Sequence, residues 1–295
     1  MSARMRFRTA VDPPSGALLL ALLLLSAALF MPTANLPRDT YEYIVVFDIT
    51  QSMNVQDYQL DGLPTSRLEF ARAAVRHALA ELECGSRIGW GVFAEYRTVL
   101  LMAPVEVCGA YDDLLAALDN LDGRMRWSNA SEVTKGVYWA FKAAQQLQSK
   151  PDVIFITDGH EAPPLDPAYP SPVLDELRAG EIQGWLIGAG GEAPRPIPKV
   201  NVDGEMIGYW RSFEVVQRPG SREHLSSLHE AHLQALAGQI GFEYARLTDA
   251  KSLSDAMRDR RFARRGVAKS DLYWAPALAA LCLLAWAFRP DASRH

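Results

Sequence analysis

Short apolar runs alternate with amphipathic segments through the middle of the chain. Residues 43–47 (YIVVF), 153–156 (VIFI) and 184–188 (GWLIG) are continuous apolar runs, typical of strands buried on both faces of a sheet. Five segments between and after them are expected to form helices: 67–82, 111–121, 132–147, 229–240 and 252–262. Strands that alternate with helices predict a doubly wound, Rossmann-like α/β fold with a mostly parallel sheet.

An antiparallel hairpin is expected at one edge of this sheet. Residues 87–94 and 98–103 are both strand-like, and the three residues between them place the turn at Tyr96. Cys84 and Cys108 each lie twelve residues from Tyr96, so they face each other across the hairpin. Facing β-carbons are ~4.5–5.5 Å apart, close to the ~3.5–4.5 Å of a disulfide. We therefore predict a Cys84–Cys108 disulfide and an oxidising compartment; two ordinary buried thiols are the alternative.

These elements are expected to belong to one domain, over residues 40–262. Residues 189–224 interrupt the alternation of strands and helices, because the segment is rich in glycine and proline. It contains a hairpin that we predict to turn at Asp203-Gly204. We expect this segment, called the excursion below, to be a surface part of the same domain, since no linker separates two independent cores.

Both ends of the chain carry long apolar runs. Residues 17–31 contain no charge and follow three arginines, a pattern typical of a signal-peptide core or a short membrane anchor. Pro32 stands where a cleavage site needs a small residue, so we expect residues 1–36 to remain as an uncleaved anchor. Residues 272–288 carry aromatic residues near both ends, which is typical of a transmembrane helix. A buried C-terminal helix is the alternative.

The charges that flank these runs predict the orientation. Arg4, Arg6 and Arg8 favour a cytoplasmic N-terminus, which places residues 40–262 on the periplasmic side of a bacterial inner membrane. A basic cluster before the second run opposes this, but a long folded domain is translocated largely regardless of its charges. The cluster consists of Arg258, Arg260, Arg261, Arg264, Arg265 and Lys269. The net charge of −5 gives no basic footprint for nucleic acid.

Oxygen-bearing side chains follow two of the predicted strands and precede one helix. The first strand leads into Asp48, Thr50 and Ser52, the central strand leads into Asp158, and residues 127–131 (WSNAS) add hydroxyl groups. Ligands of an open parallel sheet bind at the carboxyl ends of its strands, so we expect these side chains to meet. Their oxygens suit Mg²⁺ first, and also Ca²⁺ or Mn²⁺. Because few of these ligands are charged, we expect the cation to keep an open position for a partner's carboxylate.

These residues resemble the metal-ion-dependent adhesion site of von Willebrand factor type A (VWA) domains, whose first loop has the pattern D-x-S-x-S. Asp48, Thr50 and Ser52 occupy its three positions, with threonine in place of the first serine. The resemblance covers about residues 40–260 and implies that Asp158, in the sequence TDG, is the third-loop aspartate. We therefore expect a metal-dependent interaction module and not an enzyme.

The resemblance also implies a hydroxyl ligand from the second loop. In the family, this residue lies five positions before a small residue of the following helix. Counting back from Gly136 gives Ser131. Ser128 and Thr134 are nearby alternatives.

Longer stretches resemble particular bacterial membrane proteins of this family. The sequences IPKVNVDG and AGQIGFEYARL are similar to aerotolerance-type VWA proteins, which tend to act with a MoxR-type AAA+ ATPase. The sequences FDITQSMNVQDY and TDGHEAPP are more similar to VWA proteins encoded with methanol dehydrogenase. That resemblance implies a role in maturing a periplasmic dehydrogenase, including insertion of its calcium, with the ATPase and other VWA membrane proteins as partners.

Two other functions are considered. A membrane-anchored adhesin or envelope sensor would use the same metal site on extracellular ligands. Metal-assisted hydrolysis would need a general base beside the metal, and only His160 or Glu161 is near enough in sequence; a nucleophile elbow, a P-loop and an HExxH motif are all absent from the sequence. His224, His229 and His232 invite a zinc site, but we expect them to be solvated or capping histidines.

Overall fold

The computed structural model describes residues 13–32, 34–164, 172–177, 180–217, 222–270 and 272–288. The chain separates into two compact units. Arg38–Gly266 form the larger unit, and Met1–Pro37 together with Val267–His295 form the smaller one.

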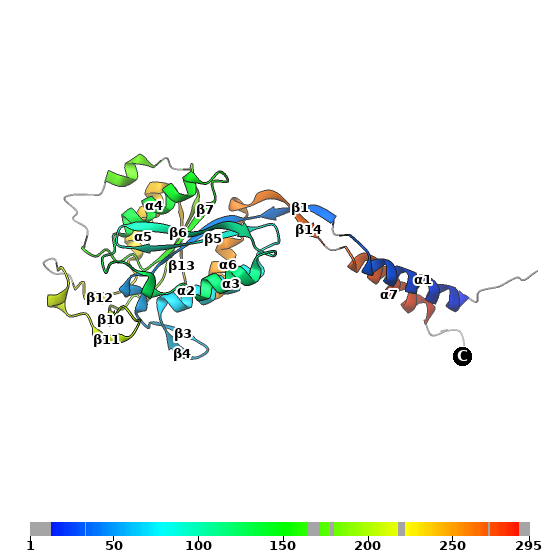
Figure 1. The fold of residues 1–295 in the computed structure, drawn as a ribbon, viewed down its shortest axis with the longest axis horizontal. Coiled ribbons are helices and arrows are strands. Elements are labelled where there is room, and N and C mark those ends of the chain that lie inside the picture. The colour runs from blue at the N-terminus through cyan, green and yellow to red at the C-terminus, as the bar shows by residue number, and fades with distance from the viewer. Residues whose placement is uncertain are drawn as a thin grey trace, which may run out of the picture. The chain divides into compact units, whose positions relative to one another are not determined.

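A six-stranded sheet forms the centre of the larger unit (Figure 1). Its strands lie in the order β13-β8-β7-β2-β5-β6, and all neighbours are parallel except β5 and β6. The strands are β2 Glu42–Asp48, β5 Arg87–Ala94, β6 Arg97–Glu106, β7 Asp152–Thr157, β8 Gly184–Gly188 and β13 Glu243–Arg246. This mostly parallel sheet with one antiparallel edge strand confirms the predicted α/β fold.

Helices cover both faces of the sheet, and the alternation of side chains along β2 explains why. Tyr43, Val45 and Phe47 are buried in the cluster that includes α2, α3 and α6. Ile44 and Val46 are buried in the cluster that includes α4 and α5, on the opposite face (Figure 1). The helices are α2 Arg67–Glu81, α3 Tyr111–Asp119, α4 Val133–Gln146, α5 Glu230–Ile240 and α6 Ala250–Met257. Burial on both faces accounts for the continuous apolar run in the sequence.

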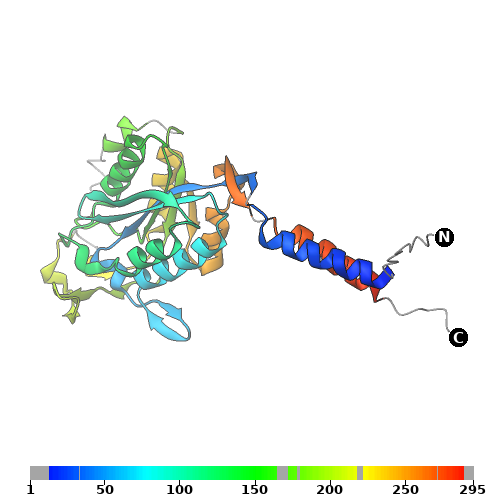
Figure 2. The same ribbon diagram turned by 45° about the vertical axis from the view of Figure 1, so that its right-hand side comes forward.

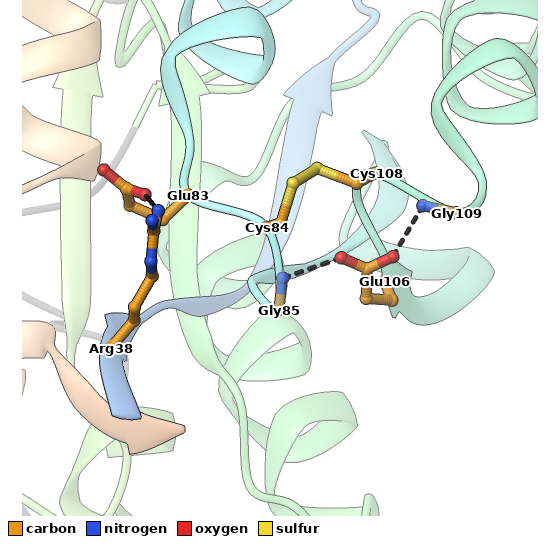
Figure 3. The surroundings of a disulfide bond; sticks show 7 residues. All are labelled: Arg38, Glu83, Cys84, Gly85, Glu106, Cys108 and Gly109. Atoms are coloured by element: carbon orange, nitrogen blue, oxygen red, sulfur yellow. Dashed lines mark hydrogen bonds and ion pairs between the residues drawn. A yellow bond between two sulfur atoms is a disulfide. The ribbon is translucent and has the colours of Figure 1, made fainter. Parts of the chain in front are cut away.

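Strands β5 and β6 form the predicted hairpin, and a disulfide closes the loops beyond its open end. Cys84 and Cys108 are bonded, with their Cα atoms 5.3 Å apart, which confirms the predicted pairing (Figure 3). The Glu106 carboxylate lies beside the bond and accepts hydrogen bonds from the backbone N–H groups of Gly85 at 2.7 Å and Gly109 at 2.5 Å. The same acid thus ties together the two loops that the disulfide joins.

Short antiparallel pairs and 3₁₀ helices complete the larger unit. In the excursion, the hairpin of β10 and β11 turns through Gly204, whose φ of +89° suits glycine, as the sequence predicts. The short strands are β3 Tyr58–Leu60 with β4 Leu63–Thr65, β9 Arg195–Pro196 with β12 Leu225–Ser226, and β10 Pro198–Val200 with β11 Met206–Tyr209. The 3₁₀ helices are η1 Gln51–Asn54, η2 Gly123–Met125, η3 Pro172–Glu176, η4 Ser212–Glu214 and η5 Arg260–Phe262.

The smaller unit contains two apolar helices that lie side by side, α1 Pro13–Leu29 and α7 Trp274–Ala287 (Figures 1 and 2). Strands β1 Ala34–Thr40 and β14 Arg264–Ser270 pair with each other. Within the described residues, no helix combines the length and the apolar character needed to cross a membrane, so the two predicted spans are not confirmed. Arg4, Arg6 and Arg8, which carry the predicted orientation, lie outside the described residues.

Candidate metal site

The first and third loops of the candidate site begin at neighbouring strand ends. β2 ends at Asp48 and β7 ends at Thr157, and the two strands are parallel partners in the sheet. Asp48 and Asp158 therefore start at the same edge of the sheet, and both are fully buried. The Thr157 hydroxyl donates a hydrogen bond of 2.6 Å to Oδ2 of Asp48, which links the two loops directly.

The first loop folds around its own aspartate. Oδ1 of Asp48 accepts hydrogen bonds from the backbone N–H of Thr50 at 2.9 Å and from the Thr50 hydroxyl at 2.7 Å. The hydroxyl oxygens of Thr50 and Ser52 are 3.2 Å apart. A hydroxyl that donates to a carboxylate keeps its lone pairs, so this loop gathers three oxygen-bearing side chains that can share one cation.

Of the three candidate hydroxyls in the second loop, that of Ser131 is the one left free. Ser128 Oγ accepts a hydrogen bond from the backbone N–H of Ala130 at 3.2 Å, and Thr134 Oγ1 donates to Glu161 at 2.9 Å. Ser131 Oγ is buried and has no hydrogen-bond partner among the described residues. A buried hydroxyl without a hydrogen-bond partner is unfavourable. Of the three hydroxyls, that of Ser131 is therefore the best candidate for a metal ligand.

The position of Ser131 depends on how α4 begins. Gly136 lies in the first turns of this helix, and a β-carbon there would overlap the buried ring of Phe93 on β5. The Glu161 carboxylate accepts hydrogen bonds from the backbone N–H groups of Val133 at 2.8 Å and Thr134 at 2.9 Å, the free donors at the helix start. The close approach and the cap together fix the loop that carries Ser131.

A buried arginine, which the sequence pattern does not indicate, contacts Asp158. Nη1 of Arg67 is 2.6 Å from Oδ2 of Asp158, and its Nη2 is 2.7 Å from Oδ2 of Asp57. The Ser226 hydroxyl also donates to Oδ2 of Asp158, at 2.7 Å. Arg67 is the first residue of α2, a position typical of solvent-exposed side chains, so nothing in its spacing indicated this role.

The charges of the buried groups around the candidate site do not cancel. Asp48, Asp57, Arg67 and Asp158 have side chains at most 4% exposed, and they comprise three carboxylates and one guanidinium. Burial raises the pKa of Asp48, and the charge of Asp158 raises it further. Burial is the largest single influence on the pKa of Asp158 and would raise it, but Arg67, His160 and the hydrogen bonds to the carboxylate together lower it. A divalent cation would supply the two positive charges that this group lacks.

Both aspartates also keep a lone pair for a cation. An ionised carboxylate offers about four lone-pair positions. Asp48 uses three of them, two for Thr50 and one for Thr157. Asp158 also uses three, for Arg67, for Ser226 and for the backbone N–H of His160. Asp48, Thr50, Ser52, Ser131 and Asp158 offer the oxygen atoms that a hard divalent cation prefers, and their role as its ligands stays a prediction.

The site opens into a cavity of about 230 Å³. Thr50, Ser52 and Ser131 line it together with His160, which is only 3% exposed. Neither ring nitrogen of His160 has a hydrogen-bond partner within the described part of the chain. Nε2 lies 3.4 Å from Oε2 of Glu223, close enough for an ion pair but without hydrogen-bond geometry. The structure thus brings a buried imidazole to the mouth of the candidate site.

The remaining histidines do not form a metal site among the residues that the structure describes. The group of metal-ligating side chains found at suitable distances is Cys84, Glu106 and Cys108, whose sulfurs are bonded to each other. His232 lies 3.0 Å from Glu161, the acid that caps α4. His224 lies 3.5 Å from Gln217.

Comparison by sequence identifies one domain family. A sequence model described as the von Willebrand factor type A domain matches residues 43–160. That stretch begins in β2 and includes all five candidate ligands. No curated protein matches this chain by sequence.

Two solved structures share the fold. An aerotolerance-related membrane protein from Bacteroides fragilis NCTC 9343 superposes with a TM-score of 0.55 at 21% identity, covering 75% of this chain and 98% of that one. The conserved hypothetical protein BatB from Bacteroides thetaiotaomicron gives a TM-score of 0.54 at 21% identity, with the same coverage. At this level of identity, the likeness concerns the fold alone. Residues 43–160 therefore match the von Willebrand factor type A domain in sequence, and the chain shares its fold with these two proteins.

Proposed function

We propose that this domain is a protein-interaction module whose binding depends on a divalent cation, Mg²⁺ first among the candidates. Asp48, Thr50, Ser52, Ser131 and Asp158 would hold the ion, and an acidic side chain of a partner would complete its shell. The observation that carries the proposal is the buried hydroxyl of Ser131, which has no partner in the described residues and lines the same cavity as Thr50 and Ser52.

Interaction is favoured over catalysis by the surroundings of the two candidate bases. The Glu161 carboxylate accepts three hydrogen bonds at the start of α4, from Val133 and Thr134. Its role is therefore to cap this helix. His160 remains as a candidate base, and it is buried. A hydroxyl-rich site of low ligand charge is better suited to accepting a carboxylate.

We place the domain on the periplasmic side of a bacterial inner membrane, anchored through residues 1–36 and 272–288. The Cys84–Cys108 disulfide supports this location, because disulfides persist in oxidising compartments. The finer role that we propose is assistance in maturation or metal insertion of a periplasmic, methanol-type dehydrogenase. A MoxR-type ATPase and other VWA membrane proteins would be partners. A metal-dependent adhesin or envelope sensor is the second candidate, on the same site.

The test is capture of partners from membranes by the full-length protein. We expect a partner to be retained in Mg²⁺ and released by EDTA, and the Asp48→Ala variant to retain none. Asp203→Ala is the control, because Asp203 is an exposed acid in the β10–β11 turn. Retention that is indifferent to EDTA and to Asp48 would contradict the proposal.

The maturation role has its own test. In a strain that lacks this protein, we expect the periplasmic dehydrogenase to be made with less calcium and with lower activity. Normal calcium content and normal activity in that strain would exclude the maturation role and leave the adhesin or sensor as the remaining candidate.

A further inference from the structure

The cavity at the candidate metal site is lined by both polar and apolar side chains. The polar ones include the hydroxyls of the site, the His160 ring and two acids of the excursion, Glu214 and Glu223. The apolar ones, called the apolar wall below, come mainly from the excursion and include Ile197, Trp210, Val215 and Val216. Ile197 is 6% exposed, whereas Val216 is 66% exposed.

Gln51 connects the apolar wall to the first loop of the candidate site. It lies between Thr50 and Ser52 and is almost fully buried. Its Oε1 accepts hydrogen bonds from Trp210 Nε1 at 2.9 Å and from the backbone N–H of Val200 at 3.0 Å. Its Nε2 donates to Asn129 in the second loop at 2.6 Å. The wall and the candidate site are therefore held in one geometry, and a ligand that enters the cavity meets both.

His160 contributes a hydrogen-bond donor to the same space. A neutral imidazole always carries one N–H, and a buried N–H without an acceptor is unfavourable. The ring is buried and lines the cavity, yet neither of its nitrogens has a hydrogen-bond partner in the described residues. Its neighbour Glu223 also lines the cavity but does not meet hydrogen-bond geometry with it. An incoming acceptor would satisfy this donor.

We propose that this cavity selects a carboxylate flanked by apolar side chains, presented by a segment of a partner protein. One carboxylate oxygen would complete the cation's shell, and His160 would donate to the carboxylate from the side. The wall of Trp210, Val215 and Val216 would pack against the neighbouring apolar side chain, which burial stabilises. This inference rests on the proposed function, because the cation holds the carboxylate.

The test uses three five-residue peptides and full-length protein saturated with Mg²⁺, with affinity measured by calorimetry. The first peptide has glutamate between leucine and valine, the second replaces glutamate by glutamine, and the third replaces leucine and valine by glycine. We expect the first to bind, the glutamine peptide to lose binding, and the glycine peptide to bind about tenfold more weakly, because it buries less apolar surface. Equal affinity for all three would overturn the inference.

Two variants test the named residues. His160→Phe keeps a buried ring that cannot donate a hydrogen bond. We expect it to bind the first peptide about tenfold more weakly, because a hydrogen bond to the charged carboxylate is lost. Val216→Ser should weaken the first peptide but not the glycine peptide. Val202→Ser is the matched control, because Val202 is an exposed valine of the same excursion, outside this cavity. Unchanged peptide affinity in both test variants would overturn the inference.

Two further outcomes separate this inference from the proposed function. Failure of the wild-type protein to bind Mg²⁺ would remove both. Mg²⁺ binding that depends on Asp48, without any preference among the peptides, would remove this inference alone. If the Glu223→Gln variant bound the peptide where the wild type did not, Glu223 would itself occupy the carboxylate position, and the proposal of an external ligand would be wrong.

Discussion

Asp48 and Asp158 are equally buried, but their charges are balanced by different neighbours. Arg67 lies against Asp158, whereas Asp48 is surrounded by hydroxyl and amide donors from Thr50 and Thr157. The charge of the Arg67 guanidinium thus balances that of the Asp158 carboxylate in the third loop. A bound cation would therefore contribute most beside Asp48, in the first loop. Arg67 should therefore be a structural residue.

We expect Arg67→Met to lower the free energy of unfolding by about 3–5 kcal/mol, because it leaves the Asp57 and Asp158 carboxylates buried without their partner. Arg76→Met on the same helix is the control. Arg76 pairs with Asp119 at the surface, where an ion pair contributes only about 0–1 kcal/mol. Urea unfolding in EDTA measures both variants, and equal stability of the two would contradict the role given to Arg67.

The buried carboxyl group of Asp152, outside the candidate metal site, should make the stability of the domain depend on pH. Burial raises its pKa from 3.8 to about 6, although Arg264 acts in the opposite direction. Because the folded-state pKa lies above the unfolded one, ionised Asp152 opposes folding: the cost is absent below pH 3.8, grows as pH rises, and is complete above pH 6. The Asp152→Asn variant should therefore gain about 2–3 kcal/mol relative to the wild type between pH 4 and pH 7. Urea unfolding at the two pH values checks this, and a constant difference would contradict it.

At the scale of elements, the start of α4 connects packing with the candidate site. Gly136 permits the helix to approach Phe93, and Glu161 caps its first turn, so Ser131 is held by elements on two sides. A change in this packing should therefore alter both the Mg²⁺ affinity of the candidate site and the stability of the domain.

We expect Gly136→Ala to lower the free energy of unfolding by about 1–3 kcal/mol and to weaken Mg²⁺ binding, because the added methyl group overlaps the Phe93 ring. Gly238→Ala in α5 is the matched control. A β-carbon at Gly238 meets nothing within 4 Å, so alanine should stabilise the helix by up to about 1 kcal/mol. Thermal unfolding and Mg²⁺ titration distinguish the two; a stabilised Gly136→Ala variant would show that the close approach is unimportant.

The elements that the sequence predicts correctly are those coded by local patterns. The buried strands, the β5–β6 hairpin and its disulfide follow from apolar runs and from distances counted from a turn. The roles of Arg67 and Gln51 could not be predicted, because each joins side chains far apart in sequence. Arg67 lies 91 residues from Asp158, and Gln51 lies 159 residues from Trp210. Only the packed fold brings such pairs together.

At the scale of the whole molecule, the disulfide is a covalent constraint that other parts of the domain do not duplicate. It closes a loop of 24 residues between α2 and α3. The unfolded chain would lose conformational entropy through this closure, which stabilises the folded state by about 3.5 kcal/mol.

The Cys84→Ser/Cys108→Ser double variant should therefore be about 3.5 kcal/mol less stable than the wild type. A reducing agent should destabilise the wild type but not the double variant. Cys282→Ser is the control, because Cys282 is a free thiol in α7. Guanidinium unfolding with and without reductant makes the comparison; insensitivity of the wild type to reductant would contradict it.

The central claim is that one divalent cation binds where the loops after β2 and β7 meet the start of α4. Mg²⁺ titration of EDTA-treated, full-length protein by calorimetry tests it most directly, with circular dichroism to verify the fold. We predict that the wild type and Asp203→Ala bind one Mg²⁺ with equal affinity, and that Asp48→Ala keeps its fold but binds none. Undiminished Mg²⁺ affinity in a folded Asp48→Ala variant would contradict the claim.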